Sequence, residues 1–302
     1  MAGPPRVPYR VGPVSKVRFF GQYLVASGVA SPAAIAAALS QQAVTNLPLG
    51  ALALARGLLS ERQVLVIHTE QRRTDKRFGE LAVAMGFLRR QQLDELLREQ
   101  AEAHLLLGEA LVQSGACTRA QLDASWAAFQ KDQATAEEAV RAAIQATAAP
   151  QLVAIATDVT GRMMLRMGKL PAKVAAVDAR GVFPRVEHAL WLRVEGDKPF
   201  TYLLGLTSTD LLALARCMLE PLKAGELPET IVPLVLDVGR ELVLATVGQI
   251  VSRLAGEGWR LRPGIPDVAP ALPASVLEGS LVRCTLVLPH GGEAALGLVL
   301  HA

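Results

Sequence analysis

The first 130 residues repeat one pattern of glycine, apolar and polar positions four times. Two glycines seven residues apart recur at intervals of 29 residues, which is typical of a repeat protein. The first glycine of each unit is Gly21, Gly50, Gly79 or Gly108, and the second is Gly28, Gly57, Gly86 or Gly115. Three residues later stand Ser31, Ser60, Arg89 and Thr118. Because Ser and Thr cap helix starts, each unit predicts a short helix, a glycine break and a capped second helix.

Apolar residues continue this register along the second helix of each unit. Four and eight positions after the cap the chain has Ile35 and Leu39, Val64 and His68, Leu93 and Leu97, and Leu122 and Trp126. This spacing keeps one face of a helix apolar. Gln42, Gln71 and Gln100 close the first three units. We therefore predict an all-α helical repeat domain over residues 18–130.

The pattern changes after the repeats. Residues 131–150 are rich in Ala, Gln and Glu and lack the glycine period, so they predict a connecting helix or linker. Residues 151–302 predict an α/β domain. Its expected helices cover residues 152–167, 208–220 and 231–254, and its expected strands cover residues 189–195, 200–207, 282–288 and 294–300. Gly291 and Gly292 should turn the last two strands into a closing hairpin.

Composition narrows the class of protein. A chain of 302 residues is long enough for two domains. The net charge is only +3 and no basic run occurs, which disfavours nucleic-acid binding. Its three cysteines are far apart, as expected in a reducing cytoplasm. Because no Cys or His residues have metal-ligand spacing, we expect no metal and no cofactor. We expect residues 1–17 to form an N-terminal tail.

The uncharged stretch from Phe19 to Ala55 superficially resembles a signal peptide or membrane span. It contains several polar residues and prolines, among them Gln22, Pro32 and Pro48, and its glycines keep the repeat register. Small Ala-rich helices explain the lack of charge better than a signal peptide or a membrane span does. We expect no membrane insertion and a cytoplasmic location.

The third unit resembles the MshEN motif, which occurs in the N-terminal domains of type II secretion (GspE-N) and type IV pilus assembly ATPases. That motif has Arg-Leu-Gly, a hydrophobic pair, a Gly, and spaced Leu, Leu and Gln. It is matched by Arg77-Phe78-Gly79, Ala82-Val83, Gly86, Leu93, Leu97 and Gln100. The resemblance implies that two units make one module, which gives modules at residues 19–71 and 77–130. It also implies cyclic di-GMP as a ligand.

Such a ligand has two phosphates and two guanines, so a receptor needs backbone amides, an Arg and apolar surface. The nucleotide-binding candidates are Arg77, Gly79, Gly86, Gln100, Gly108 and Gly115. The other three units have Phe19, Pro48 or Leu106 at the Arg position. The alternative is a purely structural repeat, in which the glycines stop helices and the glutamines solvate their ends.

The C-terminal half resembles the CheX-like chemotaxis phosphatase domain. The resemblance rests on the order of elements, on Gly205, on Asp237, Glu241 and Gly248 in the long helix, and on residues 258–263. In that family a helical Glu-x-x-Asn pair acts on phosphorylated response regulators. Here Glu241 stands at the acid position, but Leu244 stands at the Asn position. Leucine cannot orient the attacking water. Glu241 is then a vestigial candidate, and we expect no enzyme.

The sequence therefore predicts a cytoplasmic signalling or adaptor protein. Its repeats would sense cyclic di-GMP or dock a partner, and its inactive CheX-like domain would bind protein. The partner would be a response regulator or a component of a secretion or pilus ATPase. One alternative is a response-regulator phosphatase with divergent catalytic residues. Another is a ligand-free scaffold of pilus or secretion machinery.

Overall fold

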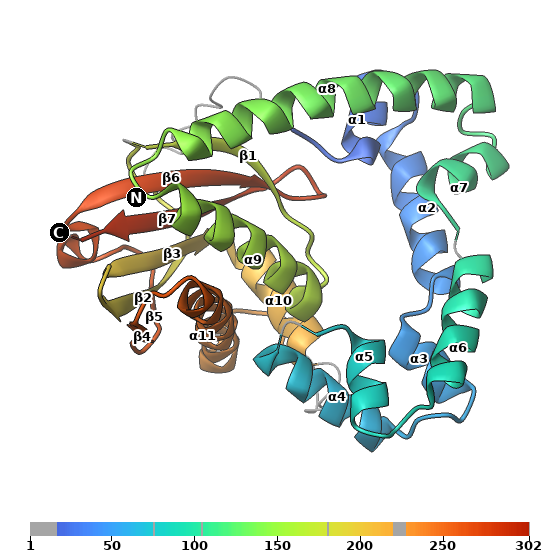
Figure 1. The fold of residues 1–302 in the computed structure, drawn as a ribbon. Coiled ribbons are helices and arrows are strands. Elements are labelled where there is room, and N and C mark those ends of the chain that lie inside the picture. Colours follow the sequence, from blue (N-terminus) through green and yellow to red (C-terminus); the bar gives the residue numbers. More distant parts are fainter. Residues whose placement is uncertain (1–16, 75, 104, 180, 220–227, 302) are drawn as a thin grey trace, which may run out of the picture.

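The structure is a computed structural model that describes residues 17–74, 76–103, 105–179, 181–219 and 228–301. The expected N-terminal tail, residues 1–17, lies outside the described residues except for Val17. The N-terminal helices form an arch, and both ends of the arch return to a C-terminal sheet and its helices (Figure 1).

Each repeat unit contains a seven-residue helix followed by a longer one. The short helices are α1 (Phe20–Ala26), α3 (Leu49–Ala55), α5 (Phe78–Ala84) and α7 (Leu107–Gln113). The longer ones are α2 (Pro32–Thr45), α4 (Glu61–Arg73), α6 (Arg90–Ala103) and α8 (Arg119–Gln145). The predicted caps form at Ser31, Ser60 and Thr118, whose hydroxyl oxygens accept backbone N–H groups at 3.1, 3.3 and 3.2 Å.

The two glycines of a unit have different structural tasks. The second one follows the short helix with a φ of 67° to 72° in all four units, a conformation that strains other residues. The first one lets the two helices approach. A Cβ atom at Gly79 would lie 2.5 Å from Leu93, and one at Gly108 would lie 2.6 Å from Leu122. The equivalent distances are longer in the first two units, 3.2 Å from Gly21 to Ile35 and 3.5 Å from Gly50 to Val64.

Apolar packing pairs the units in a different order from that implied by the sequence. One cluster joins the first unit to the fourth and includes Leu24, Ala38, Leu111 and Leu122. Another joins the second unit to the third and includes Leu52, Ile67, Leu81 and Leu96. The expected modules at residues 19–71 and 77–130 therefore do not correspond to the packing. The reason is that the apolar faces of consecutive units two and three cover each other, so units one and four are left to pair.

Glutamine side chains reinforce this pairing. Gln42 Nε2 of the first unit donates to the carbonyl oxygen of Leu105, just before the fourth, at 2.8 Å. Gln100 Nε2 of the third unit donates to the carbonyl oxygen of Leu47, just before the second, also at 2.8 Å. Each amide thus satisfies a carbonyl at the entrance of the paired unit's short helix.

The connection between the halves is shorter than residues 131–150. Helix α8 runs without interruption from the fourth unit to Gln145, because this stretch contains good helix formers and no Gly or Pro. Helix α9 (Pro150–Gly168) then begins with a proline at its first position.

The C-terminal half is an antiparallel sheet with helices on one face. The strand order is β1 (Lys173–Asp178), β6 (Ser280–Val287), β7 (Glu293–Leu300), β3 (Phe200–Leu206), β2 (His188–Gly196) and β4 (Leu261–Pro263), and β5 (Asp267–Ala269) also pairs with β2. The predicted closing hairpin is confirmed, with Gly291 at a φ of 87° in its turn. Strands β1, β4 and β5 were not predicted, since each is short or partly exposed.

Helices α9, α10 (Ser208–Leu219) and α11 (Pro233–Gly256) pack side by side on this sheet (Figure 1). The predicted end of α10 at residue 220 lies outside the described residues. Within the core the Tyr202 hydroxyl lies 3.0 Å from Thr160 Oγ1 of α9, and complete burial raises the pKa of Tyr202. The core therefore fixes α9 against β3 and leaves the outer faces of α9 and α11 exposed.

Candidate functional site

The second repeat unit, Phe78 of the third unit and the C-terminal half line a partly open cavity of about 520 Å³, which we call the second-unit cavity. Its repeat wall is formed by the start of α3 and by one face of α4, including Gly50, Val64 and His68. The opposite wall consists of residues from α9 and α10 and the turn after α9: Met163, Arg166, Met167, Lys169, Cys217 and Met218. Neither half forms this cavity alone.

A second cavity, of about 710 Å³, lies at the first repeat unit, and we call it the first-unit cavity. Its repeat wall includes residues 19, 20, 21, 22, 25, 35 and 39, and each of these lies 29 positions before a wall residue of the second-unit cavity. The opposite wall contains Pro171 and the β6–β7 turn with Pro289, His290 and Gly291. The same surface of two units therefore faces the C-terminal half at two places.

Polar contacts fix the first unit to the C-terminal half. Gln22 Nε2 donates to the carbonyl oxygens of Leu288 and Pro289 at 2.6 and 3.1 Å. The Lys173 ammonium donates to the carbonyl oxygen of Arg18 at 3.2 Å and lies 5.1 Å from the ring centre of Phe19. Burial of this ammonium lowers the pKa of Lys173.

Most of the predicted nucleotide-binding residues have structural tasks. Gly79 and Gly108 allow close helix packing, Gly86 and Gly115 follow the short helices with positive φ, and the Gln100 amide holds a backbone carbonyl. Gly108 and Gly115 also belong to the unit that packs on the first, not on the third. Arg77 is exposed at the start of α5, where its backbone N–H donates to Glu80 Oε2 at 3.0 Å. Of the predicted set, Arg77 is the exposed side chain, and the half-exposed Gln100 lines a separate cavity of about 470 Å³.

Sequence reasoning missed Arg166 and Lys169, because they lie outside the repeats. One signal was present at Lys169, which follows the C-terminal end of α9, where glycine is usual. Its φ is 50°, and it is the one non-glycine residue with a positive φ in the part of the chain that the structure describes.

The residues that resemble a CheX-like site lie along one exposed stripe of α11. Asp237, Glu241, Leu244 and Gly248 are all exposed, and Leu244 exposes 39% of its surface. Residues spaced by four, seven and eleven positions share a helix face. The arch therefore leaves this stripe accessible to a protein partner.

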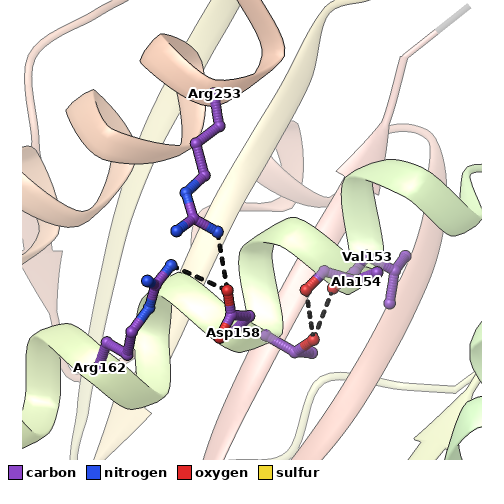
Figure 2. A network of polar contacts seen from close by, with 6 residues as sticks. Val153, Ala154, Asp158, Arg162 and Arg253 are labelled. Atoms are coloured by element: carbon purple, nitrogen blue, oxygen red, sulfur yellow. Dashed lines mark hydrogen bonds and ion pairs between the residues drawn. The ribbon is translucent and has the colours of Figure 1, made fainter. Parts of the chain in front are cut away.

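Helix α9 carries a similar arrangement that the sequence analysis overlooked. Asp158, Arg162 and Leu165 have the spacing of Asp237, Glu241 and Leu244. Figure 2 shows that Asp158 Oδ2 accepts from both Arg162 Nη2 and Arg253 Nη1, each at 2.8 Å. This ion-paired group joins α9 to α11, and a basic residue occupies the position that corresponds to Glu241.

The remaining reactive groups give little sign of another site. Burial raises the pKa of the Cys284 thiol to about 12, so this thiol is a poor nucleophile. Within the described residues no group of three or more His, Cys, Asp or Glu side chains could hold a metal ion. None of the described helices is long and apolar enough to cross a membrane.

Comparisons with known proteins give matches at the level of structure. No protein family model matches the chain, and no curated protein matches its sequence. Solved structures of chemotaxis protein CheX cover 50% of this chain and 99% of their own. The one from Desulfovibrio desulfuricans is 12% identical with a TM-score of 0.43, and the one from Vibrio vulnificus is 16% identical with a TM-score of 0.44. A CheX–CheY complex from Borrelia burgdorferi matches the same share at 10% identity and a TM-score of 0.41.

Proposed function

We propose that this protein is a signalling adaptor that binds a response regulator through α11 and does not dephosphorylate it. The observation that carries the proposal is the exposed pair of Glu241 and Leu244 on α11. Hydrolysis of an aspartyl phosphate needs a group that orients an in-line water, and an aliphatic side chain has no donor or acceptor for this task.

Helix α9 offers no replacement for the missing amide. Leu165 stands where its spacing would place an amide, and it exposes 51% of its surface. Arg162 stands at the acid position and is held by Asp158. Glu241 therefore serves as a contact for a partner protein rather than as part of a catalytic pair.

The test is phosphate release from a cognate phosphorylated response regulator. We expect the full-length protein to bind the regulator without raising its dephosphorylation rate, and Glu241→Ala to weaken that binding. Leu244→Asn restores a Glu-x-x-Asn pair and serves as the gain-of-function comparison. Phosphate release by the unmodified protein that Glu241→Ala abolishes would establish the phosphatase alternative instead.

A second function, cyclic di-GMP sensing by the repeats, is favoured by one specific observation. Two units present the same seven positions to cavities of about 520 and 710 Å³, which lie within the usual range of about 300–1,000 Å³ for small-molecule sites. A ligand-free scaffold for a secretion or pilus ATPase needs no such cavities.

Calorimetry of the full-length protein with cyclic di-GMP separates sensor from scaffold. If the third unit holds the ligand, Arg77→Ala should weaken binding by about 1.5–3 kcal/mol, the range for a charge-assisted hydrogen bond. Unchanged binding by this variant would show that Arg77 does not hold the ligand. If saturating ligand gives neither heat nor thermal stabilisation, the ligand-free scaffold is the remaining function for the repeats.

A further inference from the structure

We infer that the first-unit cavity binds an uncharged, largely apolar small molecule that carries one hydroxyl or N–H group, and that the His290 ring accepts a hydrogen bond from this group. The inference goes beyond the proposed functions, because cyclic di-GMP carries two negative charges and the described wall of this cavity has no Lys or Arg. Its failure would leave the proposals of regulator binding and of cyclic di-GMP sensing untouched.

The wall of the first-unit cavity selects against charged ligands. Among its described residues there is no Asp, Glu, Lys or Arg. A charged ligand would lose part of its hydration here without gaining an ion-pair partner, which is costly. The cavity therefore disfavours carboxylates, phosphates and ammonium groups.

Most of this wall is apolar, and it comes from both halves of the chain. Phe19, Phe20 and Leu39 belong to the first unit, whereas Pro171 and Pro289 belong to the C-terminal half. Leu39 exposes 47% of its surface, so part of the wall is in contact with water. A ligand with an apolar body gains affinity by covering this surface.

A buried carboxylate positions the His290 ring on this wall. Asp210, near the start of α10, exposes 2% of its surface, and its Oδ1 lies 3.2 Å from His290 Nε2. Its other oxygen, Oδ2, accepts a hydrogen bond from the Thr207 hydroxyl at 2.6 Å. Because Nε2 faces this fixed carboxylate, the orientation of the ring is fixed as well.

The second ring nitrogen of His290 is the polar group that is left for a ligand. A carboxylate accepts hydrogen bonds, so Asp210 favours the ring form with the proton on Nε2, and Nδ1 of the neutral ring is then an acceptor. Nδ1 has no hydrogen-bond partner among the described residues. The other polar side chain on the wall, Gln22, is engaged with backbone groups. A hydroxyl or N–H donor on the ligand matches this single acceptor.

The site is built for binding, since the described wall contains no Ser, Thr or Cys that could serve as a nucleophile beside the ring. The β6–β7 turn that carries His290 is also the turn that Gln22 holds through the carbonyl oxygens of Leu288 and Pro289. These bonds keep the ring opposite the repeat wall. A ligand in this cavity would contact both halves, so its binding would stabilise the first unit on the sheet.

The experiment is a calorimetric titration of the full-length protein with three uncomplicated probes, at about pH 8, where imidazole side chains are ordinarily neutral. Decan-1-ol carries a hydroxyl donor, its isomer 1-methoxynonane lacks the donor, and decanoate carries a negative charge. We expect decan-1-ol to bind about threefold to tenfold more tightly than 1-methoxynonane, the range for one hydrogen bond. Decanoate should bind at least about tenfold more weakly than decan-1-ol, because its charge finds no partner.

Two neighbouring alanines of α2 provide a matched pair of variants. Ala36 and Ala37 are both exposed, and Ala36 lines the cavity whereas Ala37 does not. Ala36→Trp should fill the cavity and weaken decan-1-ol binding at least about tenfold, and Ala37→Trp should leave it unchanged. His290→Phe keeps a ring but removes the acceptor, so it should bind decan-1-ol and 1-methoxynonane equally.

Any of three results would overturn the inference. The first is that decan-1-ol does not bind more tightly than about 0.1 mM. The second is equal binding by Ala36→Trp and Ala37→Trp, which would place the probe outside the first-unit cavity. The third is a preference for decan-1-ol over 1-methoxynonane that persists in His290→Phe, which would show that the ring does not hold the hydroxyl group.

Discussion

The first-unit and second-unit cavities have the same repeat wall but different opposite walls. Seven positions displaced by 29 residues line both cavities. The opposite wall of the first-unit cavity contains prolines, Gly291 and His290, whereas that of the second-unit cavity contains Arg166 and Lys169. The repeats thus supply a common apolar surface, while the C-terminal half determines the chemistry of each cavity.

The two helices of the third and fourth units pack more tightly than those of the first and second. Leu93 and Leu122 lie close to Gly79 and Gly108, while the β-branched Ile35 and Val64 lie further from Gly21 and Gly50. Ile35 and Val64 are also wall residues of the two cavities. A β-branched residue at this position therefore accompanies a wider separation from the first glycine, and a leucine accompanies close packing.

Gly79→Ala tests this contrast and should have the largest effect. The added methyl carbon would lie 2.5 Å from the buried Leu93, so overpacking should lower the free energy of unfolding by about 1–3 kcal/mol. Gly21→Ala is the matched variant, and its 3.2 Å contact with Ile35 should cost less than about 1 kcal/mol. Urea denaturation measures both, and equal costs would remove the distinction between tight and open units.

Gln22→Ala should have the next largest effect. It removes the two hydrogen bonds to the β6–β7 turn and the bond from the backbone N–H of Phe19 to Gln22 Oε1. We expect a loss of about 1–2 kcal/mol, because three bonds at about 0.5–1.5 kcal/mol each are partly offset by the side-chain entropy that an ordered glutamine loses. Ala51→Gln, at the equivalent position of the second unit, is the variant with which Gln22→Ala is compared. A melting temperature unchanged by Gln22→Ala would show that the first unit is not held to the sheet by this amide.

Replacement of the second glycine should affect the units equally. Gly57 and Gly86 have φ angles of 67° and 72°, and nothing lies within 4 Å of a Cβ atom at either position. Gly57→Val and Gly86→Val should therefore each cost at least about 1 kcal/mol through backbone strain alone. Thermal unfolding checks this, and markedly different costs would mean that the units are not equivalent at their turns.

Lys169→Gly should have the smallest effect on stability and the opposite sign. Relief of the positive φ should raise the free energy of unfolding by about 0.5–1 kcal/mol in the absence of ligand. Denaturation without nucleotide measures this gain. Destabilisation would show that the interactions of the lysine side chain contribute more to folding than the backbone strain costs.

Local rules recovered much of the fold from the sequence. The caps at Ser31, Ser60 and Thr118 and the closing hairpin depend on neighbouring residues, and all are present. The pairing of units was not predictable in this way, since it depends on which apolar faces meet in space. The strands β1, β4 and β5 were not predicted for the same reason. Their conformation depends on their partners in the sheet more than on their own residues.

The candidate site was less predictable than the fold. In the structure Gly79, Gly86 and Gln100 support packing, turns and hydrogen bonds, which the motif alone does not reveal. Arg166 lies outside the four units, so the repeat register that marks Gly50 does not mark Arg166. Only the folded arch brings the two residues to one cavity.

Hydrogen exchange of the full-length protein with and without cyclic di-GMP tests the shared site most directly. The account predicts ligand-dependent protection in both walls of the second-unit cavity, namely α3 and α4 on one side and the C-terminal end of α9 with α10 on the other. Protection confined to α5 and α6 around Arg77, or no protection at saturating nucleotide, would contradict a site shared by the two halves.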